Sequence, residues 1–457
     1  MIKFTKDFNS CKTVSCKNFG IPNSETYIQK SERLGYLSTE CTLCGSNPPW
    51  INNHLIKEVL AEKQEAQFGQ KIIGCQKCRP YFFMPLAPKA KRHGFTSAGT
   101  QRKKCNQCAS VFTLPEYKNR EALKAVLVSV LSKGELSKDT LTSSIKESGL
   151  SSRLYYFYLN KLALIFSNFS RLQEQPVITR KYMGMHSEGR VISLNHQRGL
   201  YNLFTAEVES GYILLQTNNL THQEIGKDFI YNETESTVAT NIASNDLEAI
   251  LLARYHSNLK RNHFEQLIMG KLKPIANCTA IYPDKVAYLH FQLLTYFTNN
   301  IEQYDHYIEH ESTLRSAALI SSLADINNKK ADIYFLLPFE NSNESLTGKR
   351  FGWWNDIWFS QEKGAICPIT SKSNEMPNLN TIKCDAIEDF YRFLNKQLNK
   401  NSNSMQVLDN LSEIYRVIYN YCEPQKEKTS AMLLGISDRI YQPEQLLDEA
   451  LERLQAD

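Results

Sequence analysis

Residues 190–217 read RVISLNHQRGLYNLFTAEVESGYILLQT, and this stretch decides the fold. Apolar and β-branched residues recur in three short runs, at 190–194, 201–208 and 212–217, a pattern that predicts three strands. The tripeptide Glu209-Ser210-Gly211 separates the last two runs and favours a tight turn, because glycine adopts turn conformations at little cost. We therefore expect an antiparallel meander.

Helical and strand patterns alternate after this meander. Helices are expected at 245–262, 285–298 and 312–327, and strands at 304–308 and 332–337. Three antiparallel strands followed by alternating helix and strand is the order of an RNase H-like domain, which we place at residues 177–398. Two more amphipathic helices are expected at 385–398 and 406–421, the second within a C-terminal helical segment at 399–457.

Helical periodicity also precedes the meander, in a segment that spans residues 116–175. Apolar residues recur at helical spacing from Asn119, a short helix is expected after Ser137, and a third helix opens at Ser151 or Ser152. Gly149 marks a tight turn before the third helix, so the order is that of a helix-turn-helix. Three side chains of the third helix would enter a major groove: Arg153, Tyr156 and Asn160. Helical bundles without a nucleic acid partner show the same pattern.

Eight of the twelve cysteines lie before residue 110, in four pairs. Three pairs have C-x-x-C spacing, which lets two thiolates bind one tetrahedral Zn²⁺. We expect two structural zinc sites. Cys75, Cys78, Cys105 and Cys108 would form a zinc ribbon at 71–115, and Cys11, Cys16, Cys41 and Cys44 would form a second site within 1–70. Crossed pairing between these pairs stays open.

Disulfides or redox-active pairs are the alternative interpretation of these cysteines. The residues after Met1 include no apolar signal-peptide core, so we expect reduced thiols and a cytoplasmic location. A length of 457 residues with 42% hydrophobic residues can support several folded domains. No apolar run reaches the roughly 20 residues that cross a bilayer, so no membrane contact is expected. The sequence predicts a multidomain α+β protein.

The net charge of +5 is concentrated in one place. Between Pro88 and Cys105 the chain has no acidic residue but has these basic ones: Lys89, Lys91, Arg92, Arg102, Lys103 and Lys104. A solvated charged face is the alternative interpretation. Because the run lies between zinc-binding pairs and precedes a helix-turn-helix pattern, we expect it to bind the phosphates of double-stranded DNA. RNA is less favoured, since no aromatic RNA-reading motif is visible.

The segment from Arg92 to Phe112 resembles the N-terminal zinc domain of bacterial insertion-sequence (DDE-type) transposases. It follows that family's string Gly-x-x-x-x-Gly-x-x-Arg-Tyr-x-Cys-x-x-Cys-x-x-x-Phe, except that Lys103 stands in place of the aromatic residue. The likeness continues in 187–195, 205–212, 309–318 and 431–439. The resemblance implies an RNase H-like domain in which three acidic residues hold two Mg²⁺ or Mn²⁺ ions. It also implies a homo-oligomer or a partner transposition protein.

The resemblance places the first acid at Glu188 and the second at Glu309 or Glu311. The family has aspartate at these positions, so each carboxylate here reaches one methylene further. The third acid stays open among Asp246, Asp332, Glu340 and Asp356. Two functions therefore remain. One is an active transposase that binds, cuts and joins DNA. The other is a catalytically inactive, transposase-derived regulator or accessory subunit that binds DNA.

Overall fold

The computed structural model describes residues 7–33, 36–69, 74–78, 89–113, 119–132, 141–194, 198–223, 247–260, 275, 278–339, 349–351, 356–371, 376–398 and 404–456. The chain divides into two compact units. One contains Ile2–Ala61 and Ile178–Tyr391, and we call it the sheet unit. The other contains Glu62–Val177 and Arg392–Asp457, and we call it the helical unit. Each unit is therefore built from separate stretches of sequence.

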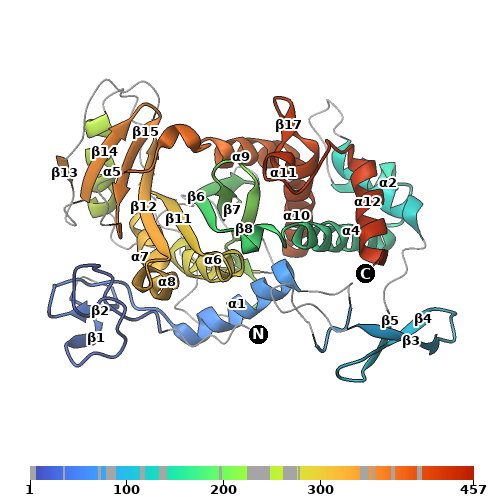
Figure 1. Cartoon of the computed structure of the whole chain (residues 1–457), viewed down its shortest axis with the longest axis horizontal. Helices are drawn as coiled ribbons and strands as arrows, with labels where there is room; N and C mark the ends of the chain where they lie inside the picture. Colours follow the sequence, from blue (N-terminus) through green and yellow to red (C-terminus); the bar gives the residue numbers. More distant parts are fainter. Residues whose placement is uncertain are drawn as a thin grey trace. The chain divides into compact units, whose positions relative to one another are not determined.

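The sheet unit is built around a mixed eight-stranded sheet with the order β13-β14-β15-β12-β11-β6-β7-β8. The predicted meander is confirmed as β6 (Tyr182–Ser193), β7 (Gly199–Glu207) and β8 (Ile213–Asn218), which pair antiparallel. β11 (Gln303–Glu309) adds to the other side of β6 in parallel, and β12 (Ala331–Pro338) adds in parallel to β11. In Figure 1 these five strands form the part of the sheet that ends at β8.

Helices connect and cover these central strands. α7 (Ser312–Ser321) and α8 (Leu323–Asn327) join β11 to β12, and α6 (Pro283–Thr298) packs against α7, β7 and β8 (Figure 1). Pro283 lies in the first turn of α6, where its missing N–H is not needed. α5 (Leu247–Lys260) and α9 (Ala386–Gln397) correspond to two further predicted helices. The sequence pattern thus located the elements of this region closely.

Three strands extend the sheet beyond β12, and the sequence pattern did not predict them. They are β13 (Lys349–Phe351), β14 (Asp356–Gln361) and β15 (Gly364–Pro368), and β15 pairs antiparallel with β12. Gly364 has a φ of +148°, and a Cβ there would lie 2.3 Å from the carbonyl oxygen of Leu337. The close approach of β15 to β12 therefore requires glycine at this position.

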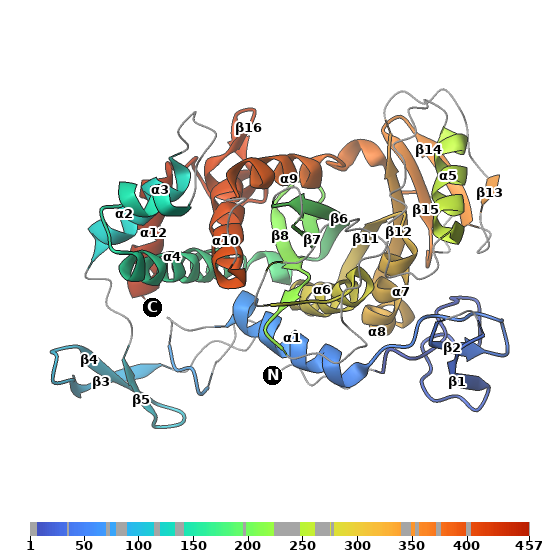
Figure 2. The same ribbon diagram turned by 180° about the vertical axis from the view of Figure 1, so that it is seen from behind.

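The helical unit contains the three helices expected between residues 116 and 175. They are α2 (Arg120–Leu131), α3 (Leu141–Glu147) and α4 (Ser152–Gln173), and Gly149, with a φ of +67°, makes the turn before α4. α4 packs against α2, α10 (Met405–Cys422) and α12 (Pro443–Ala456), as Figure 2 shows. α10 was predicted from its periodicity, whereas α12 was not. Among the described residues, no helix is both long and apolar enough to cross a membrane.

Small antiparallel sheets accompany the cysteine pairs at the start of the chain. β1 (Tyr27–Ser31) and β2 (Ser38–Cys41) precede the long helix α1 (Asn53–Phe68). β3 (Ala90–Phe95), β4 (Gln101–Cys105) and β5 (Val111–Thr113) form a separate three-stranded sheet. Cys41 ends β2 and Cys105 ends β4, so each site uses the end of a strand to orient a thiol.

Candidate metal centres and acidic cluster

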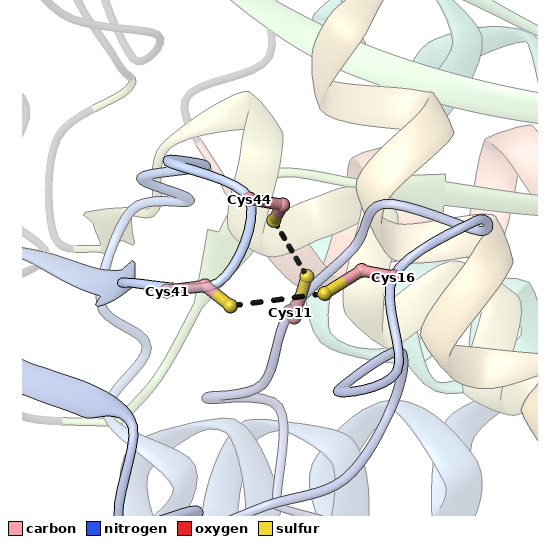
Figure 3. Close-up of side chains that lie close together, drawn as sticks. All are labelled: Cys11, Cys16, Cys41 and Cys44. Atoms are coloured by element: carbon pink, nitrogen blue, oxygen red, sulfur yellow. Dashed lines mark hydrogen bonds between the residues drawn. The ribbon is translucent and has the colours of Figure 1, made fainter.

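The first cysteine site brings together all four of its predicted ligands (Figure 3). The Sγ atoms of Cys11, Cys16, Cys41 and Cys44 all lie within 4.8 Å of one another. Cys11 and Cys44 are 3.5 Å apart, and Cys16 and Cys41 are 3.9 Å apart. Tetrahedral Zn²⁺ with Zn–S bonds of about 2.3 Å needs sulfur atoms about 3.8 Å apart. The four thiols therefore fit one zinc ion.

The second site has the same geometry. Cys75 and Cys108 have their Sγ atoms 3.6 Å apart, and Cys78 and Cys105 have theirs 3.7 Å apart. All four sulfur atoms again lie within 4.8 Å of one another. The grouping expected from the sequence is confirmed at both sites, and the cysteine pairs are not crossed between them. The protein therefore has two groups of four thiols that can each hold a zinc ion.

A serine follows the last cysteine of each site and favours its thiolate. The Cys108 Sγ lies 3.2 Å from Ser110 Oγ, and this hydrogen bond lowers the pKa of Cys108 to about 6. Burial raises the pKa of Cys44, but its hydrogen bonds with Ser46, whose Oγ is 3.4 Å away, outweigh it and lower the value to about 6. Because the thiolate is the form that binds metal, these serines favour one metal-binding thiolate at each site, whereas burial raises the pKa of Cys11 and Cys75.

The first cysteine site is attached to the sheet unit through buried contacts. Arg315 on α7 donates a hydrogen bond from Nη1 to the backbone carbonyl of Lys12, at 3.2 Å. The ring of Phe8 is fully buried, and its centroid lies 4.7 Å from that of Tyr288 on α6. The loop that carries Cys11 is therefore part of the same packed structure as α6 and α7.

The basic run identified in the sequence lies on β3 and β4. The strand register sets Lys91 directly opposite Lys104, and Arg92 directly opposite Lys103. Like charges at opposed positions of an antiparallel pair destabilise the pair. Lys89, Lys91, Arg92 and Arg102 are exposed, and within the described residues no carboxylate forms an ion pair with any of the six basic residues. An anionic partner would relieve this repulsion.

The exposed side of α4 carries the three residues predicted to contact DNA. Arg153 and Tyr156 are exposed, and Asn160 is half-buried. Phe157 is also half exposed, and the Lys161 ammonium lies over its ring, 4.5 Å from the centroid. Phe157 and Lys161 were not among the predicted contacts. The surface at the start of α4 therefore combines positive charge with exposed aromatic rings.

The acids assigned to the first and second positions lie on neighbouring strands of the central sheet. Glu188 is on β6 and Glu309 ends β11, and Ser187 pairs with Ile308 in the register of the two strands. The Gly189 amide donates a hydrogen bond to Glu309 Oε2 at 3.3 Å. The structure thus brings these two predicted residues together, at the end of the parallel strand β11.

A third acid, Glu388, joins this group and was not proposed from the sequence. Glu388 lies in the first turn of α9, and its Oε2 is 3.1 Å from Arg190 Nε. Arg190 Nη2 is 2.5 Å from Glu188 Oε1. One guanidinium therefore bridges an acid from β6 and an acid from α9. We refer to Glu188, Glu309, Glu388 and Arg190 together as the acidic cluster.

Two contacts hold the start of α9 against the meander. Phe390 packs edge-on against Phe204 of β7, with ring centroids 5.5 Å apart. The Tyr391 hydroxyl donates to the Val191 carbonyl oxygen at 3.1 Å. Because Phe204 pairs with Glu188 across β6 and β7, these contacts bring the first turn of α9 beside Glu188. A first-turn acid of the helix after the last strand was the available sequence signal, and Glu388 shares it with Asp389.

The other candidate acids have separate roles in the structure. Glu311 is the N-cap of α7, and its side chain accepts a hydrogen bond from the Thr313 amide at 3.4 Å. Asp356 accepts from the Tyr255 hydroxyl at 2.6 Å, and Asp332 accepts from Thr370 Oγ1 at 3.3 Å. Asp246 and Glu340 lie outside the described residues. Glu188 and Glu388 are thus the acids that pair with Arg190, and Glu309 contacts the neighbouring Gly189 amide.

Burial and mutual repulsion set the electrostatics of the acidic cluster. Two main causes raise the pKa of Glu309 above its usual value. The larger is the loss of hydration of its buried carboxyl group, and the smaller is repulsion from Glu188. Burial lowers the pKa of Arg190, but the nearby carboxylates of Glu188 and Glu309 outweigh it and raise that pKa. His186 lies on the same face of β6 as Glu188 and is 1% exposed. Neither of its ring nitrogens has a hydrogen-bond partner among the described residues. Burial lowers the pKa of His186 to about 4, so its imidazole is neutral.

Comparison with known proteins adds no relationship to this picture. The chain matches no protein-family model, and no curated protein is significantly similar to it in sequence.

Proposed function

We propose that this chain is a transposase-like DNA-binding protein with a metal-dependent centre for cutting and joining DNA strands. The observation that carries the proposal is that Glu188 of β6 and Glu388 of α9 pair with the same guanidinium, that of Arg190, and that Glu309 of β11 accepts a hydrogen bond from the neighbouring Gly189 amide. Phosphoryl transfer by divalent ions uses carboxylates from several elements as metal ligands. We propose Glu388 as the third acid, in place of the candidates weighed from the sequence.

The arrangement of the sheet supports an RNase H-like interpretation. Such a domain has a three-stranded antiparallel meander and two further parallel strands next to its first strand. In this chain the meander is β6, β7 and β8, and the two parallel strands are β11 and β12. The proposed acids then come from the first strand, from the end of the fourth strand and from a later helix. Fold likeness alone does not assign an activity, so the proposal rests on the acids.

The donors of the acidic cluster suit a hard divalent cation. Mg²⁺ and Mn²⁺ prefer carboxylate oxygens, and Glu188 and Glu309 offer them from adjacent strands. A bound ion of this kind would activate a water or hydroxyl and stabilise the leaving oxygen. Among the protein's own groups, the Gly189 amide orients Glu309, and Arg190 holds Glu388 close to Glu188. These carboxylates are of the donor type that the proposed metal chemistry needs.

DNA binding is proposed for the ribbon of β3 to β5 and for the start of α4. The opposed pairs Lys91/Lys104 and Arg92/Lys103 repel each other unless an anion lies between them, and a phosphate backbone supplies such anions. In a helix-turn-helix of α2, α3 and α4, the exposed Arg153 and Tyr156 would face a groove. Zinc in the two cysteine groups would hold the modules in shape.

The test is Mn²⁺-dependent nicking of supercoiled plasmid by the full-length, zinc-loaded protein. Glu188→Gln, Glu309→Gln and Glu388→Gln should each lower the nicking rate by at least about 100-fold, because each removes a charged ligand at nearly constant volume. Asp389→Asn is the matched control, since Asp389 is the exposed neighbour of Glu388 on α9. Nicking that survives all three glutamine variants would refute the proposed centre.

A second candidate function is favoured by one contact. Arg190 already bridges Glu188 and Glu388, and a carboxylate paired with arginine needs no metal ion to balance its charge. The same chain would then be a catalytically inactive regulator that binds DNA. This function would be favoured if the protein bound zinc and DNA but nicked no plasmid. The plasmids tested should include some that carry the terminal sequences of a candidate mobile element.

A further inference from the structure

We propose that Lys12 is the buried counter-cation of the first zinc centre, so that zinc binding by its four cysteines and the packing of α6 stabilise each other. Lys12 directly follows the ligand Cys11 in the chain, and both belong to the sheet unit, as α6 does. Lys12 would have this role whether or not the chain acts on DNA.

The Lys12 ammonium is buried without a partner of its own. Lys12 is 4% exposed, and its Nζ forms no hydrogen bond with any described residue. It lies over the ring of Tyr288 on α6, 5.3 Å from the ring centroid. An aromatic face attracts a cation, but this attraction is much weaker than the hydration that a buried ammonium loses. Lys12 therefore needs a negative charge within the protein.

The carboxylates near Lys12 do not supply that charge. Asp284, also buried, forms an ion pair with Lys285, and Lys285 repels Lys12 more strongly than Asp284 attracts it. Asp7 attracts Lys12 more weakly than Asp284 does. Around the Lys12 ammonium, repulsion from its nearest cation therefore outweighs the attraction of either acid.

Arg315 does not change this balance. Its guanidinium is buried and donates to the Lys12 carbonyl oxygen at 3.2 Å. The carboxylate that attracts Arg315 most strongly is that of Asp356. Lys285 and Arg315 thus each have an acid, whereas Lys12 is a third buried cation beside them.

The first cysteine site supplies the missing charge when zinc is bound. One Zn²⁺ with four thiolates carries a net charge of two minus. Cys11 is fully buried, and its thiolate attracts the Lys12 ammonium. Ser46 Oγ, 3.5 Å from Cys11 Sγ, and Asn18 Nδ2, 3.5 Å from Cys41 Sγ, are neutral groups and leave the net charge unchanged. Lys12 is therefore a buried cation beside an anionic centre.

Lys17 provides the matched control. It follows the ligand Cys16 as Lys12 follows Cys11, but it is exposed, so water balances its charge. Zinc affinity is measured on the full-length protein by competition with a chelating dye, and Cys75→Ser, which keeps the first site, identifies the ion that belongs to it. Lys12→Met should weaken zinc binding at the first site at least about 10-fold, as loss of a group beside metal ligands commonly does. Lys17→Met should change it less than about 3-fold, because solvent and salt screen an exposed charge.

The zinc-free protein distinguishes a charge effect from lost packing. Without zinc, Lys12→Met should be at least as stable as wild type, because it no longer buries an unbalanced ammonium. The rise in Tm when zinc is added should therefore be smaller in Lys12→Met than in wild type. Unchanged zinc affinity in Lys12→Met would overturn the inference. An equal loss of stability with and without zinc would also overturn it, since that result indicates a packing role alone.

Acetylation of the wild-type protein tests the same inference without a variant, and it decides the question if Lys12→Met does not fold. Mass spectrometry compares the modification of Lys12 and Lys17 by acetic anhydride. Lys12 should stay unmodified in the zinc-loaded protein and become modified once a chelator removes zinc, whereas Lys17 should be modified in both states. Modification of Lys12 to the same extent as Lys17 with zinc bound, or protection of Lys12 that persists without zinc, would contradict the proposed role.

Discussion

Arg315 and Lys12 are joined by a buried hydrogen bond, 3.2 Å from the Arg315 Nη1 to the Lys12 carbonyl oxygen. Lys12 directly follows the zinc-site residue Cys11, and Arg315 lies in the first turns of α7, just after Glu309. This bond connects the loop of the first cysteine site to the helix that follows the acidic strand. The first site therefore supports the sheet unit, in addition to any role in binding DNA.

Loss of zinc from the two sites should have unequal effects on the sheet unit. Cys11→Ser and Cys75→Ser should each remove one zinc ion per chain, measured by elemental analysis. Cys11→Ser should also destabilise the sheet unit by about 3 kcal/mol or more, since a structural zinc ion contributes roughly 10 kcal/mol to a small module. Hydrogen exchange in β11 and α7 measures this effect. Equal protection from hydrogen exchange in Cys11→Ser and Cys75→Ser would contradict the prediction.

Arg315→Met tests the same connection without touching a metal ligand. It keeps the apolar stem but leaves the buried Lys12 carbonyl without this donor, which should cost about 1–3 kcal/mol in the free energy of unfolding. Arg439→Met is the control, because Arg439 and its partner Asp438 are both exposed and such a pair contributes less than about 1 kcal/mol. Denaturant unfolding compares the two variants.

The joint change of Lys103 and Lys104 to alanine should weaken DNA binding in a salt-dependent way. Each phosphate contact that is lost should reduce the slope of log affinity against log salt by roughly 0.9. The variant should be no less stable than wild type, because the change removes two like-charge pairs between β3 and β4. Affinity is measured by fluorescence anisotropy at several salt concentrations.

Lys426 and Lys428 provide the matched control for this charge change. Both are exposed and lie outside the ribbon, so their joint change to alanine removes the same net charge. An equal loss of salt dependence in the two double variants would mean that overall charge, and not the ribbon, sets DNA affinity.

Much of the sheet unit could be predicted because its elements have strong local patterns. The meander is visible as three short runs of apolar and β-branched residues, and α6 and α7 are apolar at helical spacing, so each could be predicted from a short window. β13, β14 and β15 were missed for a physical reason. They have at most six residues and carry mixed polarity. They are held by the pairing of β13 with β14, of β14 with β15 and of β15 with β12, which is tertiary information.

The candidate sites also differ in how well the local sequence predicts them. The cysteine groups follow from C-x-x-C spacing, which is local, and the structure confirms their grouping. Glu388 could not be chosen, because nothing in the local sequence distinguishes it from Asp389 beside it. Only the packing of Phe390 on Phe204 determines which of the two adjacent acids faces Arg190. A sequence pattern covers only a few helical turns, so it cannot predict a contact between residues 190 and 388.

The raised pKa of Glu309 predicts a pH-dependent loss of stability in protein without added divalent ions. A carboxyl group whose pKa is higher in the folded than in the unfolded state stabilises the fold below its ordinary pKa and loses that contribution as pH rises through the raised value. Glu309→Gln should remove this loss. At neutral pH the variant should therefore have a higher Tm than wild type, and the difference should vanish in acid.

Glu311→Gln is the control for this pH effect. Glu311 caps α7 and lies two residues from Glu309, so a general effect of removing charge from this region would appear in both variants. A higher Tm in Glu311→Gln at neutral pH, or the same pH profile for Glu309→Gln and wild type, would refute repulsion at Glu309 as the cause. Thermal unfolding followed by circular dichroism between about pH 4 and pH 8 makes the comparison.

A buried ion network holds α4 to α10 in the helical unit, and Glu174 is its centre. Its carboxylate lies 2.7 Å from Arg171 Nη1 and 3.5 Å from Arg416 Nη1, and all three side chains are fully buried. Glu174→Gln should destabilise the protein by about 3–5 kcal/mol, because it leaves buried positive charge without its counterion. Glu449→Gln should cost less than about 0.5 kcal/mol, because its partner Arg453 is half exposed on α12. Urea unfolding distinguishes the two. If the two variants lost nearly the same free energy of unfolding, the charge of the buried arginines would be balanced without Glu174. Glu413, which also pairs with Arg416 at 2.7 Å, would then supply that balance.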